Sequence, residues 1–237
     1  MKRTLFLVEG KTEQIFLRYF LEKIASYQDT RIEFKILSKT NILAEEVRGA
    51  PLEDCSFLIQ IVNMQGDESV ISYITENIEA ISKKNYDAIF GLRDRYTGDS
   101  KRKPPNQEKI DGLMLQISNE NKIQTEVVIA REEIEAWFLA TPEFFKSLHS
   151  DLTLEKIGEI VDFDFENGDI ESIEHPSAMI KKILRSVDLD YRKRSDESHK
   201  IASHLDYEKL YLEKTAIIKP LKRVVNNLDY SITAKQA

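Results

Sequence analysis

Two kinds of hydrophobic pattern alternate along the first 140 residues of the chain. Short apolar runs, continuous or alternating with polar residues, are typical of strands, whereas apolar positions that recur every three or four residues are typical of helices. The patterns predict strands at residues 4–8, 32–37, 57–62, 88–92 and 125–130, and helices at residues 12–26, 67–84, 109–118 and 132–140.

This alternation predicts an α/β fold. Strands interleaved with helices, some of them continuously apolar, favour a mostly parallel sheet with helices on both faces. After about Leu148 the pattern changes: residues 151–174 are strongly acidic, helices are predicted at 176–187 and 206–228, and no strand is evident. We therefore predict an α/β domain over residues 1–150 and a C-terminal helical appendage over residues 151–237.

Acidic side chains follow three of the predicted strands. Glu9 follows the first strand, Asp94 the strand at 88–92, and Glu132, Glu133 and Glu135 the strand at 125–130. Ligands of such sheets bind outside the carboxyl ends of the strands. We therefore expect three acidic segments, far apart in sequence, to meet at one edge of the sheet.

Overall charge limits the ways in which the chain could bind nucleic acid. It has 34 basic and 41 acidic residues, a net charge of −7, whereas a protein held to DNA by bulk charge would be basic. Any contact with nucleic acid should therefore come from local patches or a bridging metal. The four histidines show no zinc-site spacing.

Targeting and redox signals favour the cytoplasm. No run approaches the roughly 20 apolar residues that a membrane-spanning helix needs, so no membrane partner is predicted. The apolar run Leu5–Val8 is shorter than the roughly 7–15 residues of a signal-peptide core, and we interpret it as a strand. The single cysteine, Cys55, excludes an internal disulfide and is consistent with a reducing compartment.

The segment Val8-Glu9-Gly10-Lys11-Thr12-Glu13 lies at a strand-to-helix turn. Gly10 permits a tight turn, and the N–H groups of the following helix favour nearby anions. The simpler interpretation makes Glu9 a loop acid and Glu13 a helix N-terminal charge. A phosphate-binding loop would need a glycine at the position of Leu5, inside the strand, so a P-loop NTPase is disfavoured.

Asp94 directly follows a buried strand, where a magnesium ligand is common. Mg²⁺ prefers one or two carboxylates, keeps several waters and often bridges to substrate phosphate. Alternatively, Asp94 caps its loop or pairs with Arg93 or Arg95.

In the segment at residues 130–139, Glu132 and Glu135 have the spacing of one helix face. The alternative is that these acids only complement the helix dipole, with Trp137 as a core anchor. Among the basic clusters, which usually belong to solvated faces, Lys101-Arg102-Lys103 would be well placed to hold a phosphate backbone beside such acids.

Three motifs together resemble the TOPRIM fold: Leu7-Val8-Glu9-Gly10-Lys11-Thr12-Glu13, Arg93-Asp94, and Arg131-Glu132-Glu133-Ile134-Glu135-Ala136-Trp137. They look most like a bacterial family of unknown function with a TOPRIM-like core, often encoded beside ABC-type ATPases and related to OLD-type nucleases. His175-Pro176-Ser177, the region 190–193 and the segment 219–221 resemble that family's C-terminal pattern, so the resemblance covers nearly the whole chain.

The resemblance implies a site for Mg²⁺ or Mn²⁺, with Glu9 as the acid/base residue and Asp94 and Glu135 as metal ligands. TOPRIM cores usually carry Asp-x-Asp, and Tyr96 occupies the second position here; Asp99 or Glu133 could substitute. The full set of candidates is Glu9, Asp94, Glu135 and Asp99 for metal, Lys11, Arg95, Lys101, Arg102 and Arg131 for phosphate, and additionally Glu13 and Glu133.

These features lead to one expected function and two alternatives. The first is a Mg²⁺-dependent nuclease that acts on nucleic acid with an ABC-type ATPase partner in a defence-type system. The second, prompted by the incomplete Asp-x-Asp, is a catalytically degraded module that binds a partner protein or nucleic acid without cleavage. The third is phosphoryl transfer on a small molecule. Fold analogy does not decide among them.

Overall fold

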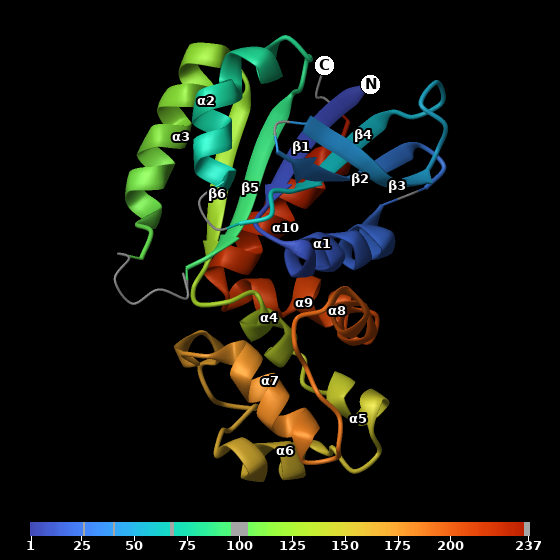
Figure 1. The fold of residues 1–237 in the computed structure, drawn as a ribbon, viewed down its shortest axis with the longest axis vertical. Helices are drawn as coiled ribbons and strands as arrows, with labels where there is room; N and C mark the ends of the chain where they lie inside the picture. The colour runs from blue at the N-terminus through green and yellow to red at the C-terminus, as the bar shows by residue number, and fades with distance from the viewer. Residues whose placement is uncertain (26, 40, 67–68, 96–103, 235–237) are drawn as a thin grey trace.

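The computed structural model describes residues 1–25, 27–39, 41–66, 69–95 and 104–234. It is built around a six-stranded sheet with strand order β3-β2-β4-β1-β5-β6 and helices on both faces (Figure 1). All strand pairs are parallel except β2–β3. The predicted α/β class and mostly parallel sheet are therefore confirmed. The strands are β1 (Lys2–Val8), β2 (Thr30–Ser38), β3 (Asn41–Gly49), β4 (Phe57–Asn63), β5 (Ala88–Asp94) and β6 (Gln124–Ala130).

The strand β3 was absent from the predicted elements. It pairs antiparallel with β2 at the edge of the sheet, and its hydrophobic residues Leu43 and Val47 are 50% and 45% exposed. An edge strand that buries few of its side chains has no strong alternation of apolar and polar residues. The hydrophobic pattern therefore gave no signal for this strand.

Two buried clusters fix the helices on the faces of the sheet. Odd-numbered positions of β1, β5 and β6, such as Leu7 and Ile89, pack with α2 (Ser69–Ser82) and α3 (Gln107–Asn121). Even-numbered positions of these strands, such as Phe6 and Phe90, pack with α1 (Lys11–Ile24) and with helices from the end of the chain. This alternation follows from the two-residue period of a strand.

Helix α4 (Glu135–Leu139) begins later than the predicted helix at 132–140. The backbone N–H of Arg95 donates to the carbonyl of Glu132, and the N–H of Ile134 donates to the Asp94 carboxylate. These bonds hold the preceding residues against the end of β5 in a non-helical conformation. The prediction that Glu132 and Glu135 share a helix face is therefore wrong.

The C-terminal part is helical, as predicted, but the expected helix at 206–228 is interrupted. Pro220 lies in the first turn of its last segment, where its fixed φ and missing N–H are tolerated. The elements are α5 (Phe144–Leu148), α6 (Leu154–Val161), η1 (Ile170–Ser172), α7 (Pro176–Arg185), α8 (Ser195–Ala202), α9 (Tyr207–Leu212), η2 (Lys214–Ala216) and α10 (Lys219–Ile232).

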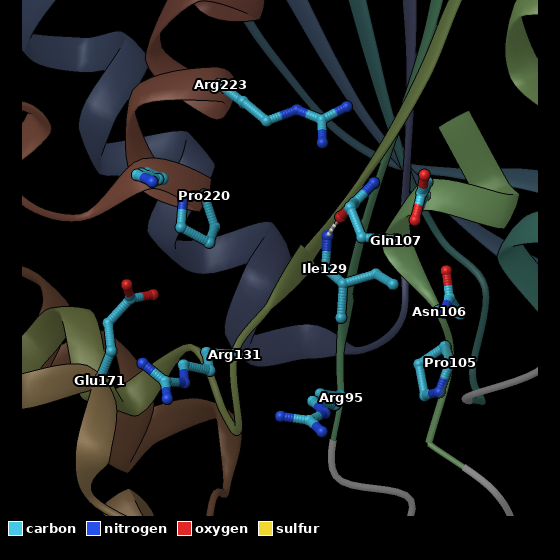
Figure 2. Close-up of a pocket in the computed structure, with 11 residues that line it drawn as sticks. Arg95, Pro105, Asn106, Gln107, Ile129, Arg131, Glu171, Pro220 and Arg223 are labelled. Carbon is cyan, nitrogen blue, oxygen red and sulfur yellow. Dashed lines mark hydrogen bonds between the residues drawn. The ribbon is translucent and has the colours of Figure 1, made fainter. Parts of the chain in front are cut away.

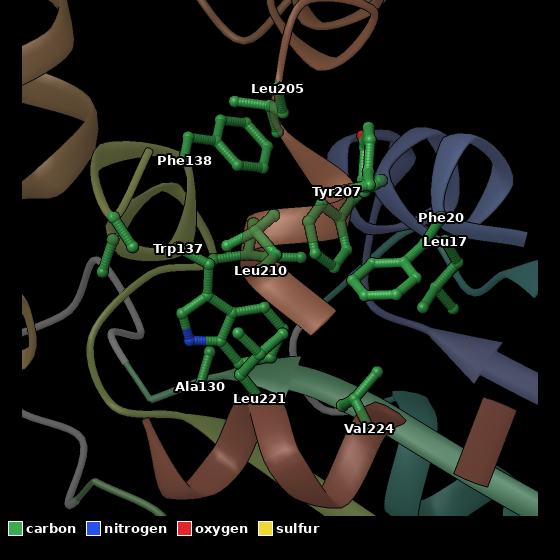
Figure 3. Packing of buried hydrophobic residues seen from close by; sticks show 14 of the residues in the cluster. Leu17, Phe20, Ala130, Trp137, Phe138, Leu205, Tyr207, Leu210, Leu221 and Val224 are labelled. Atoms are coloured by element: carbon green, nitrogen blue, oxygen red, sulfur yellow. The ribbon is translucent and has the colours of Figure 1, made fainter. Parts of the chain in front are cut away.

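These C-terminal helices pack directly on the sheet and on α1. Helix α10 contacts β1, β4, β5 and β6, while α8 and α9 contact α1. One buried cluster joins Phe20, Trp137, Tyr207 and Leu221 from both parts of the chain (Figure 3). The division into residues 1–150 and 151–237 stays a prediction, and a single hydrophobic cluster spans it.

None of the described helices has the length and apolar character needed to cross a membrane.

Candidate functional site

The acidic segments meet at the carboxyl ends of β1, β5 and β6, as predicted. The N–H of Asp94 donates to Oε2 of Glu9 at 3.0 Å, and the N–H of Ile134 donates to Oδ1 of Asp94 at 2.8 Å. The first bond joins β5 to β1, and the second joins β5 to the segment after β6. Parallel pairing of these neighbouring strands brings their carboxyl ends together.

The Asp94 carboxylate caps the segment that leads into α4. Its Oδ2 atom accepts no hydrogen bond from any described residue. Arg93 contacts the backbone carbonyl of Asp94, and Arg95 lies 3.6 Å from Glu132. Of the alternatives raised by the sequence, loop capping therefore occurs, whereas Arg93 contacts the backbone of Asp94 and Arg95 lies beside Glu132.

Glu13, in the first turn of α1, also belongs to this group. Its side chain is only 4% exposed, and Oε2 accepts a hydrogen bond from the N–H of Gly10 at 2.9 Å. A Cβ atom at Gly10 would lie 3.1 Å from that oxygen, so a glycine suits this approach. Burial, followed by repulsion from Glu135, raises the pKa of Glu13 to about 7.

Glu135 is the most deeply buried acid of the group. Its side chain is 0% exposed, and Oε1 accepts from the hydroxyl of Tyr191 at 2.9 Å and lies 3.2 Å from Nζ of Lys193. Its Oε2 atom is buried without a hydrogen-bond partner among the described residues. Burial raises the pKa of Glu135. A buried carboxylate oxygen without a partner is costly.

Lys193 is the cation that contacts these acids. Its Nζ lies 2.7 Å from Oε1 of Glu133, which also accepts from the hydroxyl of Ser177 at 3.0 Å, while Oε2 of Glu133 accepts from the N–H of Ser177 at 2.8 Å. Burial alone would raise the pKa of Glu133, but attraction to Lys193 and these hydrogen bonds hold it below its usual value. Burial likewise opposes the charge of Lys193, yet Glu135 and Glu133 raise its pKa well above the usual range.

We call Glu9, Glu13, Asp94, Glu133 and Glu135, together with Lys193, the acidic cluster. Burial, followed by repulsion from Glu13, Glu135 and Glu9, raises the pKa of Asp94 well above its usual value, and Lys193 offsets this only in part. The acidic cluster is therefore short of positive charge.

The remaining candidates lie elsewhere. Lys11 contacts Gln14 and pairs with Glu45 of β3 at 3.0 Å. Arg95 and Arg131 line a cavity beside the acidic cluster. Asp99, Lys101 and Arg102 lie outside the described residues. Within the described ranges, no three His, Cys, Asp or Glu side chains are grouped so that they could hold a metal ion.

Sequence reasoning missed Tyr191 and Lys193. They lie 56 and 60 residues after their partners Glu135 and Glu133, so no local pattern joins them. The available signal was the basic run 192–194, which has the composition of an ordinary solvated face.

Comparisons with known proteins give a family and one distant structure. The model of a family described as "Domain of unknown function (DUF4276)" matches residues 8–214. No curated protein matches the chain. The crystal structure of the hypothetical protein PH0156 from Pyrococcus horikoshii OT3 is 13% identical, with 98% of this chain and 100% of that chain covered and a TM-score of 0.49.

Proposed function

Because the chain belongs to the DUF4276 family, whose description names no activity, we propose a function from its own site: a nuclease that hydrolyses phosphodiester bonds with Mg²⁺ or Mn²⁺. The observation that carries this proposal is the meeting of Glu9, Asp94 and Glu135 at the carboxyl ends of adjacent strands.

Two carboxylate oxygens of the acidic cluster support a metal ligand role, although the described side chains do not form a ready-made group of three ligands. Hard divalent cations take carboxylate oxygens as ligands, and Oε2 of Glu135 and Oδ2 of Asp94 have no hydrogen-bond partner among the described residues. Burial, followed by repulsion from neighbouring carboxylates, raises the pKa values of Glu13 and Asp94. A divalent cation would relieve that repulsion.

In this proposal Asp94 and Glu135 hold the metal with Glu9. When bound, the metal would offset phosphate charge and polarise the scissile group. Glu9, which is half-buried beside Asp94, would transfer a proton. Glu13, whose pKa of about 7 lies near neutral pH, is a second candidate for that role, since proton transfer is most efficient when the pKa is near the working pH.

Nucleic acid as substrate and an ABC-type ATPase as partner are part of the same proposal. Both come from the TOPRIM resemblance. Phosphate contacts would come from local cations, since the net charge of the chain is −7.

The decisive experiment combines metal binding with cleavage. We expect calorimetry to detect Mn²⁺ binding that weakens by at least about tenfold in Asp94→Asn and Glu135→Gln. We expect Glu9→Gln to slow cleavage of single- or double-stranded DNA or RNA by roughly 100-fold or more. Glu132→Gln is the matched control, because Glu132 precedes α4 but pairs with Arg95 outside the acidic cluster. If Glu9→Gln and Asp94→Asn cleave as fast as the wild type, the proposed roles are wrong.

One observation favours a second candidate, a module that binds a partner without cleavage. Lys193 pairs with both Glu133 and Glu135, so an internal cation already neutralises part of the acidic cluster. A protein that binds nucleic acid or an ATPase but cleaves nothing with Mg²⁺, Mn²⁺ or other divalent metals would support this candidate over the nuclease.

A further inference from the structure

A cavity of about 630 Å³ lies beside the acidic cluster, at the edge of the sheet formed by β6 (Figure 2). Its walls come from the ends of β5 and β6 and from the first turns of α3 and α10. This volume falls within the roughly 300–1,000 Å³ of pockets that hold small organic ligands. The cavity is therefore large enough for one nucleotide.

The charged side chains that line the cavity are mostly basic. Arg95, Arg131, Lys219 and Arg223 contribute four cations, against Glu108 and Glu171. Lys219 forms no hydrogen bond or close ion pair with the described residues, but Lys219 and Arg131 both attract the carboxylate of Glu171. A phosphate group entering this cavity would compete with Glu171 for these cations.

The arginines of the wall differ in how firmly they are paired. Arg131 lies 3.9 Å from the exposed Asp169, and Arg95 lies 3.6 Å from Glu132. Both pairs are long and partly exposed, and such pairs contribute little. Arg223, in contrast, binds Asp111 of α3 at 2.7 Å. Arg223 therefore links α10 to α3 beside β6, whereas Arg95, Arg131 and Lys219 stay available to an anion.

Two helix N-termini also border the cavity. Asn106 caps α3 by accepting from the N–H of Lys109 at 3.0 Å, and Pro220 lies in the first turn of α10. The N-terminal end of a helix carries partial positive charge and unpaired N–H groups. Both helices exceed ten residues, and their dipoles add to the positive potential of the lining cations.

The rest of the lining suits more than a phosphate. Pro105, Ile129 and Pro220 offer apolar surface, and Figure 2 shows the two prolines on opposite sides of Ile129. Glu171 projects beside Arg131, and its Oε1 atom is buried without a hydrogen-bond partner among the described residues. Glu171 would repel a bare phosphate but could bond a sugar hydroxyl or a base amino group.

We propose that this cavity binds one nucleoside phosphate, with the phosphate held by Lys219, Arg131 and Arg95 and the nucleoside placed against the prolines and Glu171. The inference rests on the proposed function, because it assigns the cavity to one nucleotide of the nuclease's substrate or product. Arg95 directly follows Asp94 in the chain, so a phosphate bound here lies next to the acidic cluster. The ligand could be a free nucleotide or the end of a strand.

The test measures nucleotide binding without metal. The full chain is titrated with thymidine 5′-monophosphate in EDTA at low ionic strength, and the dissociation constant is compared among variants. We expect it to rise about tenfold in Lys219→Ala and in Arg131→Ala, which lose charged hydrogen bonds. The exposed Lys222 of α10 does not line the cavity, so Lys222→Ala is the matched control and should bind like the wild type.

Three results would overturn the proposal: no binding of the nucleotide, equal binding by wild type and Lys219→Ala, or inorganic phosphate bound as tightly as the nucleotide. A 5′-phosphorylated oligothymidylate distinguishes the two sources. Binding at least as tight as that of the monophosphate supports a strand end, and clearly weaker binding supports a free nucleotide.

Failure of this inference is separable from failure of the nuclease proposal. Binding in EDTA does not involve a metal, so nucleotide affinity is measured independently of the roles proposed for the acidic cluster. If the wild type binds the nucleotide but cleaves no nucleic acid, the nuclease proposal alone is contradicted. Metal-dependent cleavage without nucleotide binding in the cavity contradicts the subsite alone.

Discussion

The acidic cluster and the cavity lined by Arg95, Arg131, Lys219 and Arg223 border the same two strand ends. They differ in how far their charged side chains are buried and paired. Carboxylates of the cluster are largely buried, and those of Glu13, Asp94 and Glu135 have raised pKa values. Most cations of the cavity are exposed or weakly paired, and Lys219 is exposed with only the electrostatic attraction of Glu171. A buried charge without a partner lowers the free energy of unfolding, whereas an exposed charge remains hydrated and does not.

This difference predicts which measurements each region should affect. Changes in the acidic cluster should alter stability, its pH dependence and its response to divalent cations. Changes in the cavity should alter ligand affinity and leave stability nearly unchanged. The four predictions below test this contrast, from the largest expected effect to the smallest.

The largest effect is expected from the pH titration of Glu13. Its pKa rises from 4.5 to about 7 on folding, so the folded state keeps a proton that the unfolded chain has lost. The free energy of unfolding should therefore fall by roughly 3 kcal/mol between pH 4.5 and 7 and stay level above that range. In Glu13→Gln the fall should be shallower and the variant more stable than the wild type at pH 8, as measured by urea denaturation. Identical pH profiles would contradict the assignment.

The second effect concerns Lys193. Removal of one partner from a fully buried ion pair costs about 3–5 kcal/mol, and because the Lys193 side chain is 38% exposed, we expect about 2 kcal/mol for Lys193→Ala. Mg²⁺ should then raise the Tm of Lys193→Ala more than that of the wild type, since it would replace the missing cation. The exposed neighbour Arg194→Ala is the control. A variant that is destabilised but insensitive to Mg²⁺ would show that the cluster does not accept a divalent cation.

The third effect is the salt dependence of the cavity. Raising ionic strength to about 0.15 M shortens the screening length to about 8 Å, so affinity for thymidine 5′-monophosphate should fall roughly threefold, while the wild-type Tm changes little. Calorimetry and thermal unfolding in the same buffers test both halves. Affinity that does not depend on salt would show that the cations of the cavity do not bind the phosphate.

The smallest effect is that of Lys219→Ala on stability. Removal of an exposed side chain that forms no hydrogen bond or close ion pair should change the free energy of unfolding by no more than about 0.5 kcal/mol. Urea denaturation of the variant beside Lys222→Ala measures this directly. A loss as large as that of Lys193→Ala would show that Lys219 supports the fold, and the contrast between the two regions would fail.

The hydrophobic pattern identified the elements that are buried, because burial itself imposes the pattern. The strands β1, β4, β5 and β6 and the helices α1 and α3 lie within a few residues of their predicted positions. The meeting of Glu9 with Asp94 then followed from parallel pairing. The exposed strand β3 escaped prediction because it contributes few side chains to the core.

Other features of the site depend on tertiary contacts. The start of α4 is delayed by hydrogen bonds to Arg95 and Asp94, which lie some 40 residues earlier. Lys193 reaches Glu133 across 60 residues. Helix propensity and local charge contain no information about either contact. The predicted start of the helix was therefore wrong, and Lys193 was missed.

Asp94 and Arg95 are consecutive residues, and one belongs to the acidic cluster while the other lines the cavity. The N–H of Arg95 donates to the carbonyls of both Ala130 and Glu132, so the same backbone segment positions both side chains. If the two regions bind a metal and a nucleotide, any coupling between them must be reciprocal. The factor by which the metal changes nucleotide affinity is the factor by which the nucleotide changes metal affinity. A product that strengthens metal binding would then leave more slowly while the metal is bound, and metal concentration would regulate turnover through release as well as through chemistry.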